Sequence, residues 1–217
     1  MQGAIGIGFA LVCAPFLVAL SGPGEGVKSA IALSILLNLL MLLKERRDVL
    51  FKPILALLIP SLLALPVIVI LVKSLDRRPL TIAAGIVTIA GVAALATGFR
   101  TRRLKGAPAA AVAGVIGAAM NVVGGISGPP TVIYAINEGW PAKMMRPSLQ
   151  FYFLVLNVAT LFGLGLPKLN YWLLAGLAVG WIAGSAASGR VSETKLKAAM
   201  LVASAVGGLT AIAKGFF

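Results

Sequence analysis

The sequence predicts an all-α polytopic membrane protein, with about seven to eight membrane segments in a single transmembrane domain over residues 1–217. Three observations lead to this fold class. Apolar residues make up 59% of the chain and charged residues only 12%, and the mean hydropathy is +1.02. The apolar residues form long runs. The basic residues gather in the short breaks between those runs, whereas a soluble domain of this size needs much more polar surface.

Eight apolar runs follow one another along the chain. All but the fifth are about as long as a bilayer is thick, at ~1.5 Å of helix per residue. No break between the runs is long enough to hold a soluble domain. The runs lie near residues 3–20, 27–43, 50–72, 79–99, 107–136, 148–166, 169–187 and 194–213.

The first run opens with a glycine-rich stretch, QGAIGIGFALVCAP, over Gln2–Pro15. Glycine admits backbone conformations closed to other residues, so we predict a broken or re-entrant helix here, whose backbone N–H groups form an anion-binding cradle. Gln2 lies beside this cradle, and a side-chain amide binds an oxyanion without carrying charge. The alternative is that Gln2 is only terminal and solvated. The glycines of the first cradle are Gly3, Gly6 and Gly8.

The fifth run contains a stronger break, NVVGGISGPPTVIY, over Asn121–Tyr134. Three glycines and two adjacent prolines disfavour an unbroken helix, because proline removes a donor and clashes with the preceding turn. The prolines suit the first turn of a new helix, whose N–H groups and dipole would bind an anion. Broken helices of this kind form many transporter sites; the alternative is simple helix packing or a kink. The expected turn residues are Gly124, Gly125, Ser127 and Gly128.

The chain shows signs of an internal repeat. A shift of 119 residues aligns several polar residues and glycines of the two halves, which predicts one repeat over about residues 1–105 and a second over about 107–217. Met1 then corresponds to Met120, so the N-terminal helix of the first repeat is missing, either because the chain is shortened or because the halves are unequal. The aligned pairs are Gln2 with Asn121, Gly6 with Gly125, Ile7 with Ile126, Ser29 with Ser148, and Asn38 with Asn157.

The distribution of basic residues favours one topology. If all eight runs cross the membrane, the loops divide their Lys and Arg ten against nine. If the first and fifth runs instead turn back at their glycine breaks, the division is thirteen against six. This asymmetry predicts inverted repeats, with the larger group in the cytoplasm. The larger group is Lys44, Arg46, Arg47, Lys52, Arg100, Arg102, Arg103, Lys105, Lys143, Arg146, Arg190, Lys195 and Lys197, and the smaller is Lys28, Lys73, Arg77, Arg78, Lys168 and Lys214.

Polar residues within or beside the runs are candidates for the site. Asn38 and Asn157 lie inside apolar runs, where hydrogen bonds between helices are the default explanation and a functional role is the alternative. Thr131 supplies a hydroxyl group close to the second break. Arg146 follows that break, where it either draws anions towards a vestibule or anchors a loop at the interface, and the same two roles apply to Lys143 and Lys28.

Several kinds of site are not expected. The chain has no histidine and a single cysteine, Cys13, so we expect no metal, cofactor or catalytic acid–base pair. No Asp or Glu falls in the middle of a run, and a facilitative transport route is therefore favoured over a proton-driven one. Nucleic-acid binding is not expected, because the basic residues lie in short loops. The partners expected are a small anion and the lipid bilayer.

A stripe of small residues in the seventh run predicts close helix packing or a homodimer. The residues recur every four positions, which places them on one helix face. They are Gly176, Gly180 and Gly184.

Three stretches resemble the TauE/SafE family of membrane proteins. They are GAIGIGFALVCAP near the start, GVIGAAMNVVGGISGPPTVIYAINEGWP in the second half, and Arg146-Pro147-Ser148 leading to Phe151 and Tyr152. The resemblance implies export of sulfite, sulfonates or related organosulfur anions across the bacterial inner membrane. Members of the family usually carry a further helix before the first glycine motif, and this chain departs from them there.

Taken together, these observations predict a multi-pass inner-membrane exporter of a small sulfur-containing oxyanion, with no enzymatic activity. Backbone N–H groups at the two glycine-rich breaks would bind the anion. An anion channel of the same architecture and a non-transporting membrane scaffold are the alternatives. The candidate substrate-binding residues are Gln2, Gly6, Gly8, Asn121, Gly124, Gly125, Ser127, Gly128, Thr131 and Arg146.

Overall fold

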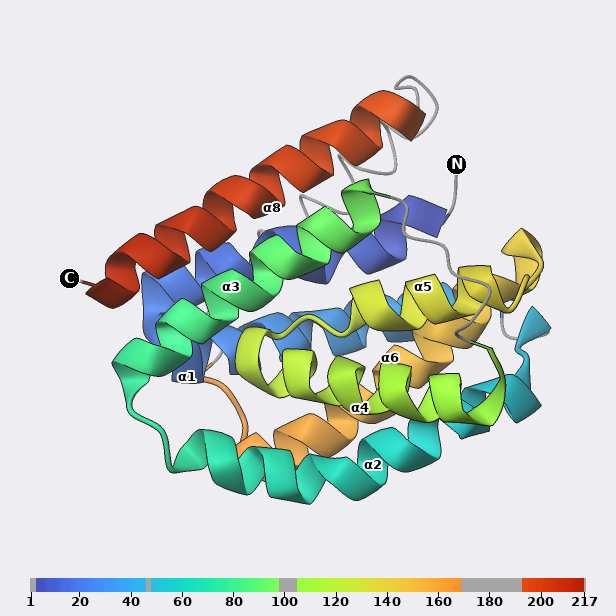
Figure 1. Ribbon diagram of the computed structural model, residues 1–217, viewed down its shortest axis with the longest axis horizontal. Coiled ribbons are helices and arrows are strands. Elements are labelled where there is room, and N and C mark those ends of the chain that lie inside the picture. The colour runs from blue at the N-terminus through green and yellow to red at the C-terminus, as the bar shows by residue number, and fades with distance from the viewer. Residues whose placement is uncertain (1–2, 46–47, 98–104, 169–192, 217) are drawn as a thin grey trace.

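The computed structural model describes residues 3–45, 48–97, 105–168 and 193–216, and this part of the chain forms helices and no strands (Figure 1). Six of these helices are long and apolar enough to cross a membrane, which confirms the predicted polytopic all-α fold class. Gln2 and the stripe of Gly176, Gly180 and Gly184 lie outside the described residues. The helices are α1 (Gly3–Glu45), α2 (Phe51–Lys73), α3 (Arg77–Ala96), α4 (Gly106–Gly124), α5 (Gly128–Asn137), α6 (Ala142–Leu164) and α8 (Glu193–Phe216).

Helix α1 is a hairpin of two antiparallel arms that meet at Gly22. Gly22 has φ 79° and ψ 168°, a conformation that favours glycine, and Pro23 then starts the second arm. The arms pack so closely beyond the turn that a Cβ atom on Gly26 would lie 2.4 Å from the carbonyl oxygen of Leu17. The two arms correspond to the first and second apolar runs, and the turn falls in the SGPGEG break between them.

The helix break predicted within Gln2–Pro15 is wrong. The backbone is helical from Gly3 up to the turn at Gly22, so Gly6 and Gly8 lie within a helix. Glycine permits a break without requiring one, at ~1 kcal/mol per residue in a helix. A membrane segment satisfies its backbone groups most simply by remaining helical. The first run therefore traverses the bundle and does not turn back within it.

The predicted break in the fifth run is present. Helix α4 ends in a left-handed cap at Gly125, whose φ is 71° and whose N–H donates to the carbonyl oxygen of Asn121 at 2.8 Å. After the non-helical residues Ile126 and Ser127, α5 runs back beside α4 (Figure 1). The N–H of Gly106 at the start of α4 donates to Oε1 of Glu138, just after α5, at 2.6 Å. The α4–α5 unit thus begins and finishes at the same end of the bundle.

The bundle has two ends, named here after Lys105 and Glu25. At the Lys105 end the Leu50 N–H donates to Ser148 Oγ at 2.8 Å, which joins the start of α2 to α6. At the Glu25 end the Lys168 N–H donates to Glu25 Oε2 at 3.0 Å, which joins the chain after α6 to the α1 hairpin.

The described basic residues divide between these two ends as the loop charges predicted. Helix α8 runs antiparallel to α3, so its last turn reaches the Glu25 end; a Cβ atom on Gly215 would lie 3.4 Å from the carbonyl oxygen of Arg78. Lys44, Lys52, Lys105, Lys143, Arg146, Lys195 and Lys197 lie towards the Lys105 end, and Lys28, Lys73, Arg77, Arg78, Lys168 and Lys214 towards the Glu25 end.

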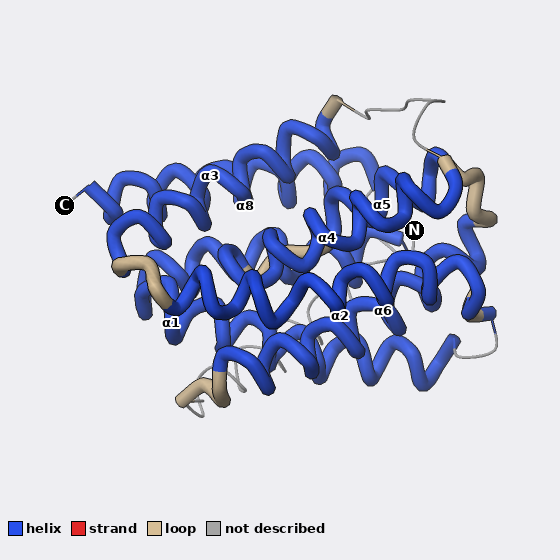
Figure 2. Tube along the Cα trace, turned by 60° about the horizontal axis from the view of Figure 1, so that its bottom comes forward, coloured by secondary structure: helices blue, strands red, loops and turns tan. Residues whose placement is uncertain are grey.

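The break between α4 and α5 lies inside the bundle, whereas the other described loops lie at its ends (Figure 2). Its glycine cap inserts into the α1 hairpin, where a Cβ atom on Gly125 would lie 3.3 Å from Ala14 Cβ and 3.4 Å from Ala30 Cβ. Those two alanines belong to opposite arms and are both fully buried. The small side chains of the hairpin therefore let the backbone of the break approach both arms.

Candidate functional site

A small cavity, here called the break cavity, lies where the α4–α5 break meets α1 and α6. Its volume is about 20 Å³. Five of its nine lining residues have polar side chains, and none of the nine carries a charge. The polar and backbone lining comes from Ser34, Asn38, Asn121, Gly125, Ser127, Gly128 and Asn157.

Three asparagine side chains meet at this cavity, and two polar atoms among them have no partner. Asn121 Nδ2 donates to Asn157 Oδ1 at 3.0 Å and to Thr160 Oγ1 at 3.1 Å. Among the described residues, nothing bonds to the buried Asn121 Oδ1 or to the buried Asn38 Nδ2. An unsatisfied buried polar group costs about 1–3 kcal/mol. Two of the residues that line the cavity therefore each carry one unpartnered polar atom.

The backbone of the break contributes fewer donors than an ordinary helix N-terminus. Pro129 and Pro130 occupy the first turn of α5 and have no N–H group. The N–H groups of Ser127 and Gly128 remain, and within the described chain neither donates a backbone hydrogen bond. Both residues are buried and line the break cavity. Of the backbone donors predicted for the cradle, the structure therefore leaves the N–H groups of Ser127 and Gly128.

Two further predicted site residues are part of the break without lining the cavity. The Thr131 hydroxyl donates to the carbonyl oxygens of Ser127 at 3.1 Å and Gly128 at 2.9 Å, so it holds the turn in place. Gly124 faces α3 instead, because a Cβ atom there would lie 3.5 Å from Val87 Cγ1.

The remaining predicted residues belong to other helices. Gly6 and Gly8 lie in the first arm of α1. Arg146 lies near the start of α6, eleven residues before Asn157, a separation of about 16 Å along a helix. Arg146 is therefore closer to the Lys105 end than to the break.

The pairing of Asn38 with Asn157 in the 119-residue shift has a structural counterpart. Asn38 lies on the second arm of α1 and Asn157 on α6, and both line the break cavity from different helices. Both side chains are at most 4% exposed. The structure thus brings them to the same place as Asn121.

The sequence interpretation missed Gln150. This residue of α6 is 1% exposed, and within the described residues neither polar atom of its amide has a hydrogen-bond partner. Gln150 precedes Asn157 by seven residues, which places the two amides on one helix face. Its position as a polar residue within an apolar run is the sequence feature that could have identified it. The repeat did not reveal it, because the aligned residue is Ile31.

Comparison with known proteins yields one match. A family model described as "Sulfite exporter TauE/SafE" matches residues 1–211, a span that includes the break and all three asparagines of the cavity. No curated protein and no solved structure matches the chain.

Proposed function

The chain belongs to the TauE/SafE sulfite exporter family, which matches residues 1–211, and on this premise we propose that it exports a small sulfur-containing oxyanion, such as sulfite or an organosulfonate. It is a multi-pass membrane protein, with six described helices suited to crossing a bilayer. We place it in the bacterial inner membrane, where such an anion would be driven outward by a membrane potential that is negative inside.

The break cavity is the observation that supports this function most directly. It offers the Asn38 amide and the N–H groups of Ser127 and Gly128 to a ligand, at the positively polarised start of α5. These donors suit the oxygen atoms of a sulfite or sulfonate group. They carry no formal charge, so an anion bound to them can also leave, as transport requires.

The size of the cavity favours a carrier over an open channel. A volume of about 20 Å³ is enough for one water-sized group, since a water needs about 10–15 Å³ by this measure. A sulfite ion is larger, so the tip of the α4–α5 unit must move before the anion enters. A site that opens by such a movement is typical of alternating access.

Flux measurements on the purified protein in proteoliposomes test the proposal. We expect saturable efflux of radiolabelled sulfite, accelerated by unlabelled sulfite on the opposite side. Linear, unaccelerated flux of sulfite and chloride alike would identify a channel instead. Absence of flux for sulfite, methanesulfonate and sulfate would leave the scaffold alternative in place and contradict the proposal.

A further inference from the structure

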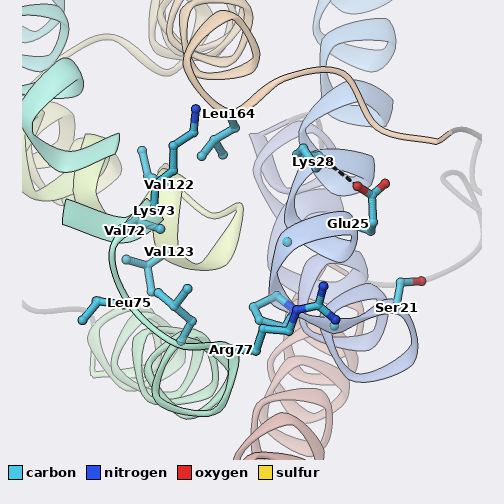
Figure 3. A pocket seen from close by; sticks show the side chains of 14 residues that line it. Ser21, Glu25, Lys28, Val72, Lys73, Leu75, Arg77, Val122, Val123 and Leu164 are labelled. Carbon is cyan, nitrogen blue, oxygen red and sulfur yellow. Dashed lines mark hydrogen bonds and ion pairs between the residues drawn. The ribbon is translucent and has the colours of Figure 1, made fainter. Parts of the chain in front are cut away.

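A second and larger cavity opens at the Glu25 end. Its volume is about 340 Å³, within the range of pockets that hold small ligands. It is lined by the Gly22 turn of α1, the end of α2 and the start of α3, together with Val122 and Val123 of α4 (Figure 3). We call it the basic vestibule, after its charged lining residues Glu25, Lys28, Lys73 and Arg77.

The charges of the basic vestibule do not cancel. Three basic side chains and one carboxylate line it, which leaves a formal charge of +2. The carboxylate of Glu25 is already engaged, since Oε1 accepts from Lys28 Nζ and Oε2 accepts from the Lys168 N–H at 3.0 Å. Among the described residues no carboxylate forms an ion pair with Lys73 or Arg77. Both of these cations are thus available to an anion.

The basic vestibule and the break cavity share a wall. Asn121 lines the break cavity, and the next two residues of α4, Val122 and Val123, line the vestibule. Val122 is 2% exposed, so its side chain is buried where the two linings adjoin. The two cavities are therefore lined by consecutive residues at the end of α4.

We propose that the basic vestibule is a second anion-binding site, which takes an oxyanion with two negative charges and lies before the break cavity on the same route. The inference rests on the proposed function only in placing both sites on one route. An excess charge of +2 matches a dianion, and walls of low dielectric concentrate the field of Lys73 and Arg77 within the cavity. The guanidinium of Arg77 can form two parallel hydrogen bonds to one oxyanion.

A cysteine reporter measures occupancy of the vestibule without any transport. Leu75 lines the vestibule and is 53% exposed. Because Cys13 is the one cysteine of the sequence, Leu75→Cys in a Cys13→Ala background carries a single thiol, at the opening of the vestibule. The readout is its rate of reaction with N-ethylmaleimide, an uncharged reagent. Nanodiscs of zwitterionic lipid exclude competition from anionic headgroups. Sulfate and methanesulfonate are the dianionic and monoanionic probes at constant ionic strength, because sulfite itself reacts with maleimides.

We expect saturating sulfate to slow the labelling several-fold and methanesulfonate to have little effect. Lys73→Gln and Arg77→Gln should each raise the half-protecting sulfate concentration about tenfold, the effect of losing one charge-assisted hydrogen bond. Arg78→Gln is the matched control, since Arg78 is adjacent and exposed but does not line the vestibule. It should leave protection unchanged.

Three results would overturn the proposal: no protection by sulfate, equal protection by both probes, or an equal effect of Arg78→Gln and Arg77→Gln. Failure of the proposed function looks different. In that case sulfate still protects the reporter, while proteoliposomes carry no sulfur oxyanion.

Discussion

Asn121 donates its amide Nδ2 to Asn157 Oδ1 at 3.0 Å, and this bond joins the end of α4 to the middle of α6. Both side chains line the break cavity and are buried there. Any movement of the α4–α5 tip away from α6 must break this bond. In the proposed carrier, an anion that takes the place of this bond would stabilise the displaced tip.

The amide of Asn121 is the first group to test. Asn121→Ala removes an uncharged donor and the unpartnered Oδ1 but leaves the turn intact, so we expect an apparent affinity about tenfold weaker, as for one good hydrogen bond. The measurement is the concentration dependence of sulfite efflux. Ser61→Ala is the control, because Ser61 is equally buried and bonds to Tyr152 away from the cavity. Unchanged affinity in Asn121→Ala would show that the amide only joins helices.

Gly125 provides a sharper test, because its matched control, Gly139, has the same φ angle. Gly125 and Gly139 both have φ 71°, so an alanine at either costs about 1–2 kcal/mol of strain. Only at Gly125 does the added Cβ atom meet neighbours, the closest 3.3 Å away in α1; at Gly139 nothing lies within 4 Å. We expect the rate of sulfite efflux to be far lower for Gly125→Ala than for Gly139→Ala when the two variants are present in equal amounts in the membrane.

Larger side chains at the break extend this test. Gly125→Val should abolish sulfite flux, because it fills the space against the α1 hairpin. Gly128→Val should do the same, because Gly128 lines the break cavity. If both valine variants insert and transport normally, the break is not the site and its glycines serve packing alone.

Arg146 should act at a distance. It lies about 16 Å along α6 from Asn157, so we expect Arg146→Ala to lower flux through a screened field, more at low salt than at high salt. Lys143 is the control, since it is exposed and paired with Asp48 at 3.4 Å. An Arg146→Ala effect independent of ionic strength would indicate direct contact with the anion or a structural role.

The division of basic residues predicts that the Lys105 end faces the cytoplasm. A membrane-impermeant maleimide applied to intact cells should therefore fail to label Arg102→Cys in a Cys13→Ala background. The same reagent should label Leu75→Cys, which is exposed at the Glu25 end. Labelling of Arg102→Cys but not of Leu75→Cys would contradict the prediction and indicate the opposite orientation in the membrane.

The sequence predicted the described membrane-spanning helices well, because a long run of apolar residues can be recognised from the residue types alone. It also predicted the second break, since adjacent prolines and a left-handed glycine act through the local backbone. The prediction of a first break was wrong because that stretch has glycines but no adjacent prolines and, in its described part, no left-handed residue. Without such a constraint on the backbone, the helix remains the more stable conformation. Gln150 was missed since its burial depends on packing between helices, which no local pattern records.

A carrier with two equivalent halves can pass from its inward-open to its outward-open form when the two halves exchange their conformations. In the described chain the helix is interrupted inside the bundle only between α4 and α5, while α1 turns at its end. The described parts of the two halves therefore offer no pair of matching breaks whose shapes could be exchanged. In the carrier proposed above, the inward-open and outward-open forms would differ in kind, with the α4–α5 tip as the element that moves relative to the α1 hairpin.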